Sequence, residues 1–132
     1  MMEEKRYEEI FSKIKDYLPK EWTKTALYFL FSGNMISHEF YVDSGNGFVS
    51  CFNMGYDDST INNIFDSIEN ILINEREKLP PKKAWSVFTM FIDKSGKFDI
   101  KYDYGNMLNK FIKYQKKWED KYIYGPKGKN KI

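Results

Sequence analysis

The stretch KTALYFLFS, residues 24–32, decides the fold of this 132-residue chain. Its centre, Ala26 to Phe31, is a continuous run of apolar and aromatic residues with the length and composition of a buried β-strand. Gly33 and Asn34 follow directly and end the run, because both residue types favour turns. The stretch therefore predicts a strand that lies inside the folded protein.

The segments around this strand predict a hairpin and a helix. Residues 36–42 and about 48–53 form strand-like runs on either side of DSGNG, residues 43–47, whose glycines and asparagine supply the positive φ values of a tight reversal. Before the central run, apolar residues recur at three- and four-residue steps over residues 3–18. This spacing predicts an amphipathic helix, which Pro19 ends.

The second half of the chain predicts a helix, two strands and a last helix. Asp57, Asp58 and Ser59 offer N-cap side chains to a one-faced apolar pattern that runs to about Lys78. Residues 84–92 are rich in β-branched and aromatic residues, and KFDIKYDY, residues 97–104, alternates strictly between apolar and charged positions. Residues 107–122 predict a helix with looser periodicity.

The order of these elements is α-β-β-β-α-β-β-α, which predicts an α+β protein. Because the two clear strand connections are short hairpins, we expect a largely antiparallel five-stranded sheet. A two-layer sandwich follows, with the helices on one face and the charged face of the fifth strand in solvent. We assign residues 1–124 to a single domain, as expected for this length, and residues 125–132 to a basic flexible tail.

The sequence contains few residues of the types that serve in catalysis or in zinc binding. Cys51 is the only cysteine and His38 the only histidine, so neither a structural zinc site nor a Ser-His-Asp or Cys-His catalytic group is expected. We predict no enzyme activity, no metal and no cofactor, and we interpret Cys51 as an inert buried thiol. The chain has no apolar run of roughly 20 residues and begins with a charged segment, which predicts a cytoplasmic protein with no membrane contact.

Charge is distributed unevenly along the chain. Residues 25–75 contain no lysine or arginine but seven carboxylates, at Glu39, Asp43, Asp57, Asp58, Asp66, Glu69 and Glu75. Only two of the 21 basic residues are arginines, and four lysines follow the last acidic residue, Asp120. Direct nucleic-acid binding is therefore not expected, because arginine is the residue that grips phosphate and guanine in two-point contacts.

The acidic middle segment favours a cationic protein as partner. We predict contacts from Asp57, Asp58, Asp66 and Glu69 around the second long helix, with Asp43 in the hairpin turn as their neighbour. The alternative is that lysines from other elements fold over these carboxylates and neutralise them.

Several segments together resemble the YezG-like immunity family, which includes the EsaG-type proteins. They are YEEIFSKIKDYLPKEW (residues 7–22), the aromatic strand from Leu27, the Trp85 strand followed by KFDIKYDY, and KWEDKYIYG (residues 117–125). The resemblance spans nearly the whole chain. It implies a cytoplasmic antitoxin that binds and blocks a polymorphic toxin exported by type VII secretion, with a nuclease toxin domain as the partner.

A non-catalytic adaptor or binding domain for another protein or small ligand is the alternative function. The sequence makes no prediction about the oligomeric state or the role of the basic tail.

Overall fold

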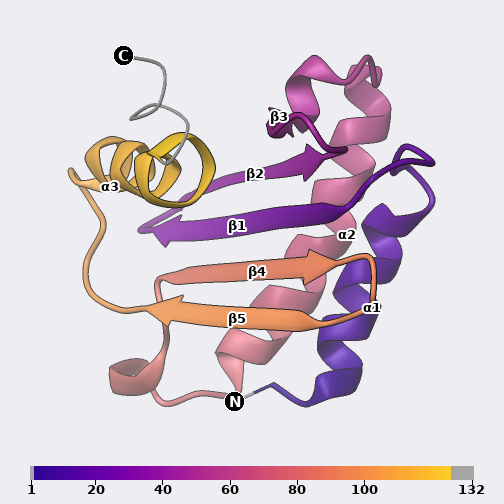
Figure 1. Cartoon of the computed structure of the whole chain (residues 1–132). Helices are drawn as coiled ribbons and strands as arrows, with labels where there is room; N and C mark the ends of the chain where they lie inside the picture. Colours follow the sequence, from indigo (N-terminus) through magenta and orange to yellow (C-terminus); the bar gives the residue numbers. More distant parts are fainter. Residues whose placement is uncertain (1, 126–132) are drawn as a thin grey trace.

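The computed structural model describes residues 2–125 and contains three helices and one five-stranded sheet (Figure 1). Their bounds are α1 Glu4–Lys15, β1 Lys24–Ser32, β2 Met35–Asp43, β3 Phe48–Ser50, α2 Asp58–Glu77, β4 Val87–Asp93, β5 Phe98–Asp103 and α3 Phe111–Glu119. Short helical turns at Cys51–Asn53, Pro81–Lys83 and Asp120–Tyr124 follow β3, precede β4 and extend α3. The α+β class and the predicted order of elements are confirmed.

The central run of the sequence is the central strand of the sheet. The strand order is β3-β2-β1-β4-β5, and every neighbouring pair is antiparallel. β1 pairs with β2 from Lys24, opposite Asp43, to Ser32, opposite Met35. On its other side β1 pairs with β4 as far as Leu30, opposite Val87. The β4–β5 hairpin therefore joins the edge of β1 that the β1–β2–β3 meander leaves free.

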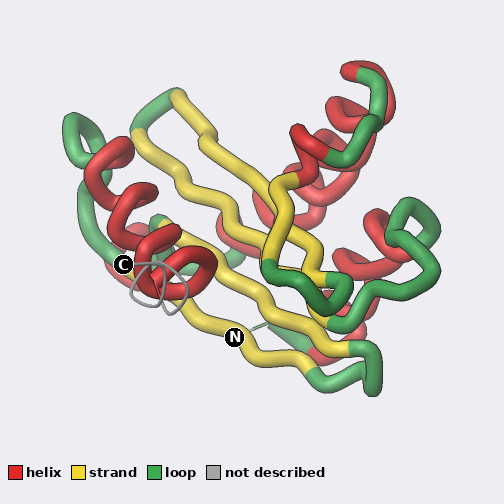
Figure 2. The backbone as a smooth tube through the Cα atoms, turned by 45° about the horizontal axis from the view of Figure 1, so that its top comes forward, coloured by secondary structure: helices red, strands yellow, loops and turns green. Residues whose placement is uncertain are grey.

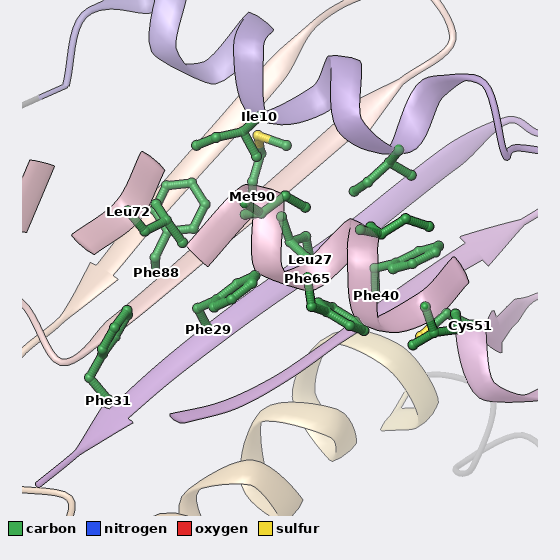
Figure 3. Close-up of a cluster of buried hydrophobic side chains, with 14 of the residues drawn as sticks. Ile10, Leu27, Phe29, Phe31, Phe40, Cys51, Phe65, Leu72, Phe88 and Met90 are labelled. Atoms are coloured by element: carbon green, nitrogen blue, oxygen red, sulfur yellow. The ribbon is translucent and has the colours of Figure 1, made fainter. Parts of the chain in front are cut away.

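Alternate side chains of β1 enter two different cores. Leu27, Phe29 and Phe31 pack under α1 and α2 with buried residues that include Ile10 and Phe65 (Figure 3). The intervening residues, Ala26, Tyr28 and Leu30, belong to a separate cluster with Trp118 and Ile123 from the C-terminal helical segment. The sheet thus has an apolar core on each face.

The prediction that all helices lie on one face is wrong for α3. Figure 2 shows α3 on one side of the strands and α1 and α2 on the other. The reason is that every residue of β1 from Thr25 to Ser32 is buried, so the central strands need cover on both faces. The structure has three layers where the sequence predicted two.

α3 is fixed to its face of the sheet by aromatic contacts and hydrogen bonds. The indole ring of Trp118 lies 4.7 Å from the ring of Tyr28, centroid to centroid, and its Nε1 donates to Thr89 Oγ1 at 2.9 Å. The Tyr41 hydroxyl donates to a carboxylate oxygen of Glu119 at 2.9 Å. These contacts hold α3 over β1, β2 and β4.

β5 keeps a charged face in solvent, as predicted. Phe98, Ile100 and Tyr102 are half-buried against the α1–α2 side, and the intervening charged side chains are exposed. α3 reaches β5 through Tyr114, whose hydroxyl donates to Asp103. The part of β5 that α3 does not cover faces solvent, which is why its side chains are polar.

Several element bounds differ from the prediction by up to four residues: α1 ends at Lys15, β4 begins at Val87, and β3 and α3 are shorter than expected. β3 ends at Ser50, three residues early, because the Ser50 hydroxyl accepts the amide of Phe52 and starts a helical turn. α3 begins at Phe111, since residues 107–110 form a turn in which Asn109 has φ +70°. Of the predicted tail, residues 126–132 lie outside the described residues.

Replacement of Trp118 tests the second core. We expect Trp118→Ala to lower the free energy of unfolding by about 3 to 5 kcal/mol, because it empties a site at the centre of the cluster under α3. Urea denaturation measures this change. Ile112→Ala on the same helix is the matched control: its side chain is 71% exposed, so its effect should stay within about 0.5 kcal/mol. Equal effects of the two substitutions would contradict the packing of α3.

Candidate protein-binding surface

The five predicted contact residues lie on α2 and on the loops beside it. Asp58 and Asp66 are exposed and Glu69 is half-buried on α2. Asp66 and Glu69 share a face because they are three residues apart, and Asp58 lies about two helical turns earlier. Asp57 caps the start of the helix, and Asp43 ends β2 at the hairpin turn.

Asp57 and Asp43 also have local structural roles. Asp57 Oδ1 accepts the amide of Thr60 at 2.8 Å, and its hydrogen bonds to Thr60 and Ser59 lower the pKa of its carboxyl group. Asp43 Oδ1 accepts the amides of Gly45 and Gly47 at 2.7 and 3.2 Å, which closes the β2–β3 turn. Helix capping and turn formation are therefore sufficient to explain these two residues.

Within residues 2–125, no lysine or arginine nitrogen lies within 4 Å of these five carboxylates. Of the acidic middle segment, Glu75 is the residue with ion pairs, to Arg6 Nε at 3.0 Å and to Lys78 Nζ at 3.3 Å. Lys24 stands opposite Asp43 in the β1–β2 register, but its ammonium lies 5.6 Å from the centroid of the Phe48 ring.

Two exposed apolar side chains lie at the same edge of the sheet. Val49 on β3 is 46% exposed, and Phe52 in the turn that follows is 58% exposed. The ring of Phe52 lies 6.3 Å from that of Phe65 on α2, next in sequence to Asp66. We call Val49, Phe52, Asp58, Asp66 and Glu69 the β3–α2 surface.

His38 forms the inner part of this surface. Its ring stacks on Phe65 with centroids 3.9 Å apart, and its Nδ1 is buried with no hydrogen-bond partner in the described part of the chain. Burial lowers the pKa of His38, and the nearby charge of Asp66 opposes this shift only partly. His38 is therefore a neutral ring at neutral pH and packs as an aromatic side chain.

Sequence reasoning missed that Glu39 and Glu119 come close together on the face of β2 that α3 covers. Glu39 accepts a hydrogen bond from Ser50 on β3, and burial raises the pKa of its carboxyl group. Glu119 of α3 lies nearby and also raises this pKa. The sequence indicated that Glu39 and Tyr41 share one face of β2, because they are two residues apart in a strand. It did not indicate which helix covers that face, because this depends on the whole fold.

Cys51 is buried, as predicted, and burial raises the pKa of its thiol to about 11. Among the residues that the structure describes, no three His, Cys, Asp or Glu side chains come together as a metal site. No helix in this part of the chain has the length and apolar content of a membrane span.

The fold and this surface define a small α+β protein that presents acidic side chains around exposed apolar ones at one sheet edge. The family model of the YezG-like immunity proteins matches residues 3–127, and the chain belongs to this family. The resemblance noted in the sequence is thereby confirmed. No curated protein matches the chain.

The pKa of His38 gives a test of the stacked arrangement. Because the unfolded chain binds this proton more readily than the folded protein, the free energy of unfolding should fall as pH is lowered from above 6.5 towards the folded-state pKa. In His38→Phe, which keeps a ring on Phe65, this part of the pH dependence should be lost. NMR titration of the His38 ring and urea denaturation at several pH values measure both effects.

The opposite contribution of Glu39, whose raised pKa destabilises the fold as pH rises above 4.5, is common to both proteins and cancels in the comparison. A His38 ring that titrates at or above 6.5 would contradict its burial against Phe65.

Proposed function

We propose that this protein is a cytoplasmic immunity protein that binds a secreted toxin, a nuclease, and inhibits it by occluding its active domain. Family membership supports the immunity role. The resemblance to EsaG-type proteins supports a nuclease exported by type VII secretion as the partner. The protein acts by binding, without catalysis and without a cofactor.

The observation that carries the nuclease assignment is the charge of the β3–α2 surface. β2, β3 and the first 18 residues of α2 contain no lysine or arginine. The three α2 carboxylates of this surface, Asp58, Asp66 and Glu69, have no ion pair in the described part of the chain. Nucleases bind a phosphate backbone and therefore present cationic surfaces. An acidic surface attracts such a domain and competes with its substrate.

The apolar residues supply the other part of the interaction. Binding energy in protein interfaces is concentrated in a few aromatic anchors that lie within a polar rim. Phe52 is the anchor in this proposal, and Asp58, Asp66 and Glu69 are the rim. Asp43 and Asp57 add negative charge at the same side of the molecule. A complex of standard size would bury about 1,600 Å².

Charge reversal tests the rim. We expect Asp66→Lys and Glu69→Lys each to raise the Kd for the nuclease toxin encoded beside this protein by about tenfold, mainly through slower association. Surface plasmon resonance at two salt concentrations measures the rates. Glu8→Lys, an equal charge change at an exposed position of α1, is the control and should bind as the wild type does. A uniform effect of all three variants would show that net charge alone matters.

Truncation of Phe52 tests the anchor. Phe52→Ala should raise the Kd by about thirtyfold or more, as for other interface hot spots, and should abolish rescue of cells that express the toxin. Its effect on the free energy of unfolding should stay below about 1 kcal/mol, because most of the side chain is in solvent. Ile112→Ala provides an exposed apolar control on α3. Full rescue by Phe52→Ala would remove this residue from the interface, and failure of the wild type to bind or rescue would refute the proposed function.

A further inference from the structure

A hollow of about 450 Å³ lies beside α3, away from the β3–α2 surface. Its walls include Tyr104 and Met107 from the loop after β5 and Lys110, Lys113 and Lys117 from α3 and the residue before it. Its volume is in the range of sites that hold a small molecule.

The three lysines lie on one side of α3 and have no counter-charge. Lys113 and Lys117, four residues apart, share one face of α3, and Lys110 is the N-cap residue before it. No carboxylate of residues 2–125 lies within 4 Å of their ammonium groups, and the first turn of α3 contains no acidic residue. Like charges at this spacing destabilise a helix slightly, so helix stability does not explain the cluster.

One carboxylate of β5, that of Asp103, contacts a residue of the hollow. Asp103 accepts a hydrogen bond from the hydroxyl of Tyr114, which also lines the hollow. Burial raises the pKa of Tyr114, so its phenol remains protonated and can donate this bond. The residues that line the hollow themselves include three ammonium groups and no acid.

Aromatic side chains complete the wall. Tyr104 is 53% exposed in a loop whose two neighbouring residues, Gly105 and Asn106, also line the hollow. An exposed tyrosine ring is a surface on which a flat heterocycle can stack. Lysine ammonium groups act as point charges for phosphate.

We propose that this hollow binds a nucleotide, with the phosphates on Lys110, Lys113 and Lys117 and the base on Tyr104. The site is separate from the proposed toxin contact, since none of its residues belongs to the β3–α2 surface. It holds a free nucleotide of this volume rather than a nucleic-acid strand, because the exposed face of β5 beside it alternates Asp99 and Asp103 with Lys101, which pairs with Asp99. This face therefore offers no run of positive charge to a continuing backbone.

Isothermal titration calorimetry of the full-length protein with ADP tests the site. We expect binding that weakens about fivefold in Lys113→Gln and further in Lys110→Gln/Lys113→Gln, because each change removes one charge near the phosphates. Tyr104→Leu should weaken ADP binding at least about fivefold by removing the stacked ring. Pyrophosphate should bind more weakly than ADP, and its affinity should not change in Tyr104→Leu.

Lys116→Gln is the matched control, since it removes the same charge from α3 at a position that does not line the hollow. Absence of ADP binding at millimolar concentration would overturn the proposal. So would equal losses in Lys113→Gln and Lys116→Gln, or binding of a single-stranded oligonucleotide but not of ADP. Toxin binding by Lys113→Gln should match the wild type, so failure of this site and failure of the immunity role are measured separately.

Discussion

Burial of β1 on both faces is the constraint on which the rest of the structure depends. Its residues from Thr25 to Ser32 are removed from solvent, and both of its edges are hydrogen-bonded, to β2 and to β4. A strand of this kind needs an apolar layer on each side. α1 and α2 provide one layer, and α3 provides the other through Trp118. The position of α3 is thus a consequence of the strand that it covers.

The same topology converts a charge pattern in the sequence into a charge pattern in space. β1 after Lys24, β2, β3 and most of α2 come from the segment without lysine or arginine, and they occupy one side of the sheet and the helix that crosses it. α3, which contains Lys113, Lys116 and Lys117, lies on the opposite face of the sheet from α2 (Figure 1). Because the carboxylates of α2 and the lysines of α3 lie on different layers, no ion pair joins them among the described residues. The surface therefore keeps a region of each sign.

Much of the fold followed from local patterns, and the main error concerns a relation between distant segments. The run Ala26–Phe31, the DSGNG turn and the Asp57 cap each act within a few residues, so their strand, hairpin and helix were predictable. The face chosen by α3 was not, because the looser apolar pattern of residues 107–122 gives no direction. The sequence did indicate that a second apolar layer was needed, because the central strand β1 lacks the alternation of polar residues that a solvent-facing side would show.

The candidate surface was likewise predicted only in part from the sequence. Its carboxylates were visible as a charge pattern, but Phe52 became a candidate only when the strand order placed β3 at the edge. The two kinds of residue contribute differently to binding. Long-range attraction from Asp58, Asp66 and Glu69 accelerates encounter with a cationic domain and weakens with salt. Desolvation of an aromatic ring acts at contact and determines how long the complex lasts. An inhibitor of a toxin needs both, since it must arrive before the substrate and then remain bound.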